Sequence, residues 1–395
     1  MRDLLFLMTC EETYFFRGGT PFTAGEDSFL PSMFPPTPSV MQGVVRTAIM
    51  TGHGIDFSVY RDRLCSVCGC PATECEVLSA IGSAGTHDDM KLDITGPFLV
   101  LNPKEESRSL LFRAPADLMD MRSLAAEPFK AGVLCPAAKP METDIGPVFM
   151  PMVENRCKPM ENAWLHEVAL QSYLKGEPIA EEHVFSEDDV VAREPRVGIA
   201  RERSTRSCQK GMLYFIEHVR LLPGFGLGAR VKNCPEVELP SAVRLGGEGR
   251  MSALHTTPWR SIDWPGIAEA IDAGPGLFGE HGFKTVFLTP VRFDGDRAIP
   301  AGFKPGIREG ARVYEGSIAG IQCTLVSMCV DRPVRLGGWN MAAGEQKPRH
   351  SYMPSGSVCY FVTKSSGSEV VQALHDVKLG LDASIGFGHV VVGRW

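Results

Sequence analysis

The first apolar run of the chain spans residues 3–9, where every position from Leu4 to Met8 is hydrophobic. Continuous apolar character over so short a length is typical of a strand that is covered on both faces, so we expect a buried strand here. A proline-studded segment follows over residues 12–38, and its backbone is poorly suited to a β-ladder. We therefore predict a surface loop between this strand and the next element.

An amphipathic helix is predicted directly after this loop. Ser39 and Gln42 have the spacing of a capping box, and Gly52 ends the pattern. Between them, apolar residues recur at the spacing of one helix face: Val40, Met41, Val44, Val45, Ala48 and Ile49. The other face carries Gln42 and Arg46, so we expect Arg46 to be an exposed cation.

From residue 54 to about residue 195 the pattern is irregular, and we interpret this segment as a large insertion. Regular alternation returns at residues 196–201 and 212–221, which predicts two antiparallel strands. The glycines within residues 224–228 favour a hairpin turn. They do not form a dinucleotide-binding motif, because their spacing is wrong and no parallel βαβ unit surrounds them.

A second set of elements follows a proline- and glycine-rich stretch at residues 258–282. The expected elements are strands over residues 284–292, 356–363 and 386–393 and a helix over residues 368–379. Strands that alternate with helices in this order are typical of a ferredoxin-like fold. We therefore predict an α+β protein with two ferredoxin-like domains: residues 1–270, with the large irregular insertion at about 54–195, and residues 271–395.

Composition narrows the class of protein. The 395 residues are 44% hydrophobic, which is enough to bury a substantial core in two domains or three. No apolar run is long enough for a signal peptide or a membrane span, so we expect a cytoplasmic protein with no membrane partner. The net charge of −7 argues against a protein that grips nucleic acid by bulk electrostatics. Any RNA contact then needs local basic patches, shared with partner subunits.

Twelve cysteines in a chain without an export signal predict reduced thiols rather than a disulfide framework. Four of them lie close together in the sequence: Cys65, Cys68, Cys70 and Cys75. Thiolates at such short spacing can form a tetrahedral zinc site, which would be a structural staple for the insertion. The paired-knuckle spacing of common zinc modules is missing, and unligated thiols are the alternative.

Several short motifs follow one another in the order in which one protein family carries them. They are FRGGTPF at 16–22, SMFPPTP at 32–38, QGVVRT at 42–47, RVGIARER at 196–203, GMLY at 211–214, LGGEGR at 245–250, PSGSV at 354–358 and GFG at 386–388. Together they resemble the third Cmr subunit of type III-B CRISPR complexes, a RAMP-superfamily protein, over the whole chain except its middle.

This resemblance implies paired RRM-like folds, each with a glycine-rich loop near its end, in a subunit of an antiviral ribonucleoprotein. It also implies partners: the large polymerase/cyclase-type subunit, other RAMP subunits, and the repeat-derived 5′ tag of the guide RNA (crRNA). The glycine loop near the C-terminus is then the first candidate for RNA contact. Gly386 and Gly388 lack a Cβ, so their backbone N–H groups could approach a phosphate; a tight turn with positive φ is the alternative.

Local positive charge supplies the remaining RNA-binding candidates. Its strongest concentration is the stretch with Arg193, Arg196, Arg201, Arg203, Arg206 and Lys210, offset only by Glu194 and Glu202. On a hairpin, alternation would place several guanidinium groups on one side, where they can bind phosphates, although such a run is often only a solvated face. We expect RNA contacts from this stretch at Arg201, Arg203 and Arg206, and elsewhere at Arg17, Gly18, Arg46 and Arg250.

Catalysis is the alternative function, because the endoribonucleases that process CRISPR repeats share this fold and often use histidine for acid–base chemistry. His53 and His87 are the candidates, but neither has a base partner nearby in the sequence. The chain also contains no Walker loop, no HExxH and no GxSxG motif. We therefore predict a non-catalytic RNA-binding subunit.

Overall fold

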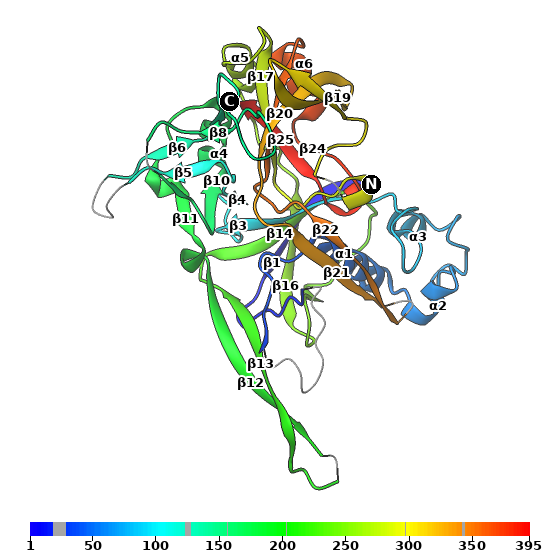
Figure 1. Cartoon of the computed structure of the whole chain (residues 1–395). Coiled ribbons are helices and arrows are strands. Elements are labelled where there is room, and N and C mark those ends of the chain that lie inside the picture. The colour runs from blue at the N-terminus through cyan, green and yellow to red at the C-terminus, as the bar shows by residue number, and fades with distance from the viewer. Residues whose placement is uncertain (19–28, 123–127, 156, 203, 297, 342–343) are drawn as a thin grey trace.

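The computed structural model describes residues 1–18, 29–122, 128–155, 157–202, 204–296, 298–341 and 344–395. The chain is a strand-rich α+β structure with two large antiparallel sheets (Figure 1). Its helices in the described residues are few and mostly short: α1 (Pro38–His53), α2 (Phe57–Arg61), α3 (Glu76–Ile81), α4 (Glu167–Lys175), α5 (Ile267–Asp272) and α6 (Gly367–Leu374). None of these helices is long and apolar enough to cross a membrane.

The first sheet is eight-stranded. Its spatial order is β11 (Val184–Ser186), β10 (Ala163–His166), β4 (Ser109–Arg113), β3 (Asp93–Leu101), β14 (Phe225–Cys234), β1 (Arg2–Thr9), β16 (Met251–Pro258) and β15 (Ala242–Arg244). The expected first strand is confirmed, because β1 lies between β14 and β16. Both of its faces are buried: Phe6 packs in one core cluster with α1, whereas Leu7 packs in a second cluster with the other sheet.

The second sheet is seven-stranded. Its spatial order is β18 (Lys304–Arg308), β19 (Ala311–Ile318), β20 (Ile321–Cys329), β23 (Val358–Thr363), β17 (His281–Phe287), β25 (His389–Arg394) and β24 (Val377–Lys378). The predicted strands at 284–292, 356–363 and 386–393 and the helix at 368–379 are therefore present, with ends shifted by a few residues. α5 and α6 contact each other and β25.

The predicted first helix is confirmed, but its predicted start is wrong. α1 begins at Pro38, whose fixed φ suits the first helical position, and Thr37 is the N-cap without a side-chain cap bond. The Ser39–Gln42 capping box does not form, and Gln42 is buried rather than exposed. The helix ends at Gly54, whose φ of 77° lets its N–H bond back to the last turn.

The expectation of one irregular insertion over residues 54–195 is wrong in part. β3 pairs with β14 and β4 inside the first sheet, so it belongs to the body of the fold. Gly96 and Pro97 interrupt the apolar pattern of this strand, which hid it in the sequence. Two irregular parts remain: residues 54–92, which carry α2 and α3, and a part with the short strands β5 (Leu118–Asp120), β6 (Ala131–Val133), β7 (Cys135–Pro136), β8 (Pro151–Met152) and β9 (Lys158–Pro159).

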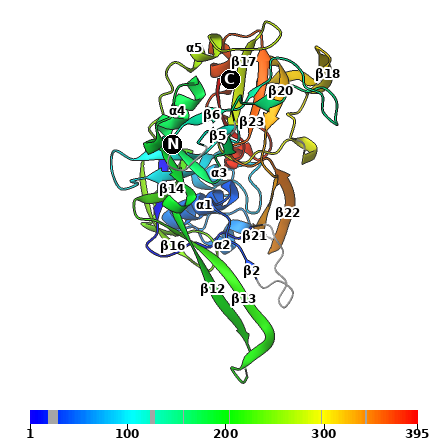
Figure 2. The same cartoon turned by 60° about the vertical axis from the view of Figure 1, so that its left-hand side comes forward.

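Two hairpins extend from the body of the protein. The longer one, the arm, consists of β12 (Val191–Arg201) and β13 (Cys208–Leu221), and Figures 1 and 2 show it projecting away from both sheets. β2 (Phe29–Leu30) pairs in parallel with β13 near the base of the arm. The shorter hairpin consists of β21 (Val334–Asn340) and β22 (Glu345–Tyr352). The two antiparallel strands predicted at 196–201 and 212–221 are thus confirmed.

Candidate functional site

The arginines at the base of the arm are neutralised by carboxylates. Arg193 forms ion pairs with Glu187 at 2.7 Å and with Glu217 at 2.6 Å. Arg196 and Arg220 both pair with Glu194, and the hydrogen bond from Arg220 is the main cause that lowers the pKa of this carboxyl group. These three guanidinium groups are therefore occupied within the protein.

Two cations near the tip of the arm are in a different situation. Arg201 ends β12 and Arg206 lies in the turn before β13, and both are exposed. In the described part of the chain, no acidic residue forms an ion pair with either of them. Arg203, the third cation predicted to contact RNA in this stretch, lies outside the described residues. The tip of the arm thus presents at least two guanidinium groups to solvent.

Arg17 and Gly18 lie beside the base of the arm. Arg17 is exposed and bridges to Ser32, whose carbonyl oxygen accepts a hydrogen bond of 3.2 Å from Arg193 of β12. No ion pair of Arg17 occurs among the described residues. Phe15, Phe16 and Phe34 of this first loop are buried, so they anchor the loop to the core rather than stack on bases, whereas Phe29 is 51% exposed.

The expectation that Arg46 is an exposed cation is wrong. Its side chain is only 9% exposed, because residues 54–92 fold over this face of α1. Nη1 donates a 2.7 Å hydrogen bond to the carbonyl oxygen of Thr86, and Nη2 donates to the Tyr60 hydroxyl and to the carbonyl of Ser83. Arg46 therefore clamps the loop after α3 onto α1.

The expectation that the C-terminal glycine loop is open to a phosphate is also wrong. Gly386 and Gly388 are buried, with φ of 108° and 68°. A Cβ on Gly388 would lie 1.8 Å from the carbonyl oxygen of Leu379, and one on Gly386 would lie 2.7 Å from that of Gly96 on β3. The positive φ offered as the alternative is present at both positions, and the loop packs between the two sheets.

Arg250 is paired with acidic residues. Its guanidinium group lies 3.0 Å from Glu12 and 3.5 Å from Glu248. It borders an open groove of about 480 Å³ that also contains Glu11 and Lys104. The mixed charge of this groove makes it a weak place for a phosphate.

The β21–β22 hairpin is a basic element that sequence reasoning missed. Arg335, Lys347 and Arg349 lie on its two strands, against one acidic residue, Glu345, and the indole of Trp339 is 57% exposed. An exposed aromatic ring among cations is a typical platform for single-stranded RNA. The alternation of residues 334–352 around the pair Gly337 and Gly338 and the single Gly344 was the available signal.

Of the four cysteines predicted to bind zinc, the fold brings Cys65 and Cys75 together with His53, while Cys68 and Cys70 lie outside this group. The ligand atoms of His53, Cys65 and Cys75 all lie within 4.8 Å of one another. The Cys68 thiol accepts a hydrogen bond from the backbone N–H of Cys70, which is the main cause that lowers its pKa to about 7. Burial raises the pKa of Cys75 to about 11. His53, Cys65 and Cys75 form a cluster that could hold a metal ion.

His87, a candidate for catalysis, does have a carboxylate partner, from the other end of the chain. Its Nε2 lies 3.0 Å from Asp382, and the same carboxylate binds Arg292 at 3.1 Å and the Tyr352 hydroxyl at 3.2 Å. The His87 hydrogen bond and the Arg292 charge lower the pKa of Asp382 well below its usual range. The carboxylate is held from three sides, so the network ties two loops together.

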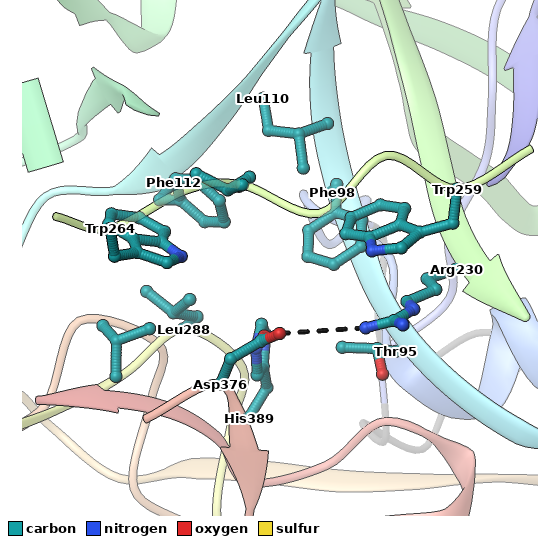
Figure 3. Close-up of a pocket in the computed structure, with 12 residues that line it drawn as sticks. Thr95, Phe98, Leu110, Phe112, Arg230, Trp259, Trp264, Leu288, Asp376 and His389 are labelled. Carbon is teal, nitrogen blue, oxygen red and sulfur yellow. Dashed lines mark hydrogen bonds and ion pairs between the residues drawn. The ribbon is translucent and has the colours of Figure 1, made fainter. Parts of the chain in front are cut away.

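The junction of the two sheets contains a small closed cavity (Figure 3). Asp376 lies 2.7 Å from His389 and 3.7 Å from Arg230, which stacks on Trp259. The cavity volume is about 10 Å³, which is roughly the space of one water molecule. It is part of the packing between the sheets and too small for a ligand.

Comparisons with known proteins identify the family. The family model described as CRISPR-associated protein (Cas_Cmr3) matches residues 6–395. A chain of the type III-B Cmr-beta complex bound to cognate target RNA and AMPPnP is 13% identical with a TM-score of 0.45, covering 100% of this chain and 99% of that chain. A chain of the Csm3-Csm4 subcomplex of the type III-A interference complex is 9% identical with a TM-score of 0.33, covering 92% and 93%. No curated protein matches the chain. The family inferred from the sequence motifs is confirmed: the chain belongs to the Cas_Cmr3 family of CRISPR-associated proteins.

Proposed function

We propose that this chain is a non-catalytic RNA-binding subunit of a type III-B CRISPR effector complex, which holds the repeat-derived 5′ tag of the crRNA and docks on the large polymerase/cyclase-type subunit. Membership in the Cas_Cmr3 family over residues 6–395 makes the chain a subunit of a type III CRISPR effector. The observation that carries the RNA-binding role is the projecting arm, whose tip presents Arg201 and Arg206 without acidic partners among the described residues.

Each large sheet supports the inference of a ferredoxin-like core. In a β-α-β-β-α-β unit the first strand lies between the third and the fourth, and the second strand lies outside the third. The order β3-β14-β1-β16 fits this arrangement with α1 as its first helix, and the order β20-β23-β17-β25 fits it with α6 as its second helix. We infer two RRM-like domains, residues 1–270 and 271–395. In the described residues, each domain has one of the two helices of a β-α-β-β-α-β unit: α1 in the first domain and α6 in the second.

Charge decides which residues can bind RNA. The chain carries a net charge of −7, so phosphate contacts depend on cations that no carboxylate neutralises. Of the residues predicted to contact RNA and described by the structure, Arg17, Arg201 and Arg206 meet this condition, and they lie along the arm and the loop at its base. A contact set this small predicts weak, salt-sensitive binding by the isolated chain, and strong binding only where other subunits add contacts.

The alternative, an endoribonuclease that processes repeat RNA, would require His53 or His87 to act as an acid or base. His87 already binds a carboxylate that Arg292 and Tyr352 share, and His53 lies beside two cysteines. Incubation of the purified chain with repeat RNA in the absence of metal separates the two functions. We expect intact RNA; cleavage that His87→Ala or His53→Ala abolishes would replace our proposal.

Crosslinking in the reconstituted complex tests the RNA-binding role directly. A crRNA with photoreactive nucleotides in its 5′ tag should crosslink to peptides of the arm, residues 191–221, whereas photoreactive nucleotides in the guide region should not. Tag crosslinks found only on other subunits would leave this chain as a protein–protein adaptor without RNA contact.

A further inference from the structure

Three separate segments of the chain converge on one point beside α1. His53 is the last residue of α1, Cys65 follows α2, and Cys75 is the N-cap of α3. Their ligand atoms lie within 4.8 Å of one another, and the two cysteines are 1% and 6% exposed. Thiols and imidazoles are the side chains that zinc prefers, and here they meet from three segments that are separate in the sequence.

Cys68 completes a set of four. Its thiol interacts with those of Cys65 and Cys75, although it lies outside the group of three whose ligand atoms are all within 4.8 Å of one another. Gly69, with a φ of 71°, donates its N–H to the carbonyl oxygen of Cys65 at 2.9 Å, and this tight turn brings Cys65 and Cys68 to the same side. Cys70 is less central, because its thiol interacts with that of Cys68 and donates to the Cys68 carbonyl at 3.6 Å.

We propose that His53, Cys65, Cys68 and Cys75 form a tetrahedral structural zinc site. Zinc ligands at about 2.3 Å for sulfur and about 2.0 Å for nitrogen lie roughly 3.5 to 3.8 Å from one another around a tetrahedral ion. The atoms of His53, Cys65 and Cys75 therefore need to approach one another by roughly 1.3 Å at most. Three thiolates and one imidazole favour zinc over magnesium or calcium, which prefer oxygen ligands.

Outer contacts hold the ligands in place. The N–H of Cys70 donates to the Cys68 thiol, and the N–H of Leu78 donates to the Cys75 thiol. Such second-layer hydrogen bonds orient ligands and stabilise the thiolate form. With all four positions filled by protein there is no open site for water, so the ion has a structural role. It fastens residues 54–92 to the end of α1, where the Arg46 clamp is the other attachment.

Metal analysis of the full-length chain purified without chelators tests the proposal. We expect one zinc ion per chain, and X-ray absorption of this protein should show three sulfur ligands at about 2.3 Å and one nitrogen at about 2.0 Å. Loss of a second-layer contact typically weakens metal binding about 10- to 100-fold. Loss of a ligand should weaken zinc binding by more than this in each of the variants Cys65→Ser, Cys75→Ser and His53→Gln. Cys70→Ser and Cys208→Ser, which changes an exposed thiol on the arm, should keep the ion.

Two results would overturn the site. A wild-type chain without zinc, or with a disulfide among these cysteines, would leave a thiol cluster that binds no metal. An absorption spectrum with four sulfur ligands, together with zinc loss in Cys70→Ser, would assign the site to the cysteines alone and remove His53. The spectrum is measured on the wild-type chain, so it stays informative if a ligand variant fails to fold. The proposed RNA-binding role depends on the arm and not on these cysteines, so a test of RNA retention and a test of zinc binding can give opposite results.

Discussion

Replacement of Lys284 by methionine is expected to destabilise the packing between the two sheets. Lys284 lies on β17 and is 1% exposed, and its ammonium group lies 3.5 Å from the carboxylate of Asp117, which is fully buried. The same carboxylate accepts hydrogen bonds from the hydroxyls of Tyr173 on α4 and Tyr360 on β23, at 2.5 and 2.9 Å. The cation also lies 3.5 Å from the centre of the Tyr173 ring. The network joins the segment between β4 and β5 to the second sheet.

The magnitude follows from what remains after the substitution. Lys284→Met keeps most of the side-chain volume but leaves the Asp117 charge buried without a cation. Removing one partner of a buried ion pair typically costs about 3 to 5 kcal/mol. The two tyrosine hydroxyls still solvate the carboxylate, so we expect about 3 kcal/mol, the lower end of this range. Burial lowers the pKa of Lys284 and Asp117 acts to raise it, which is consistent with a tightly coupled pair.

Urea unfolding, followed by tryptophan fluorescence, measures the effect. Lys304→Met serves as the control, because Lys304 is exposed on β18 and its loss should change stability by less than about 0.5 kcal/mol. The double variant Lys284→Met/Asp117→Asn removes both charges and should recover part of the loss. A single variant Lys284→Met as stable as the wild type would refute the reasoning, since the buried carboxylate would then not need its cation.

Two further substitutions test the packing at the sheet junction and the pH dependence. Gly388→Ala places a Cβ 1.8 Å from a carbonyl oxygen at a φ of 68°, so we expect a large drop in melting temperature. The control Gly310→Ala has a φ of 80° and open space around the new Cβ, so it should lower the free energy of unfolding by only about 1 kcal/mol. Equal losses of stability in the two variants would argue against a tight junction. Burial lowers the pKa of His375 from 6.5 to about 4. As the pH falls, His375 is therefore protonated in the unfolded chain before it is protonated in the folded chain. The free energy of unfolding should then decrease by about 3 kcal/mol between pH 6.5 and pH 4. His375→Gln should flatten that part of the pH profile of stability, and an unchanged slope would contradict this origin.

Much of the fold was readable from the sequence where one segment carried its own periodic signal. The apolar run of β1, the helical spacing of α1 and α6, and the alternation of the arm each predicted the right element. β3 was missed because Gly96 and Pro97 break its apolar run, although it pairs with β14 along most of its length and with β4 at residues 99–101. The capping box failed because Pro38 starts α1 earlier, with Thr37 as the N-cap, and Gln42 is buried.

The candidate sites show the same limit. The spacing of the cysteines was enough to suggest a metal cluster, but His53 joins it only because the chain turns back after α1. A tight turn with positive φ at Gly386 was only the alternative to RNA contact in the sequence, and the packing against β3 shows that the loop faces inward. Arg46 and His87 depend on contacts 40 and 295 residues away in the sequence, so their burial and pairing had no local signal.

Salt dependence of crRNA retention by the reconstituted complex tests the central claim most directly. The variant Arg201→Ala/Arg206→Ala removes two unpaired cations at the tip of the arm, and Lys304→Ala/Arg312→Ala removes two exposed cations from the second sheet as a matched control. Each lost phosphate contact on single-stranded RNA lowers the slope of log affinity against log salt by about 0.7, so the arm variant should lose about 1.4 and release the guide at lower salt. The control should behave as the wild type. An arm variant that retains crRNA with the wild-type slope would contradict the account.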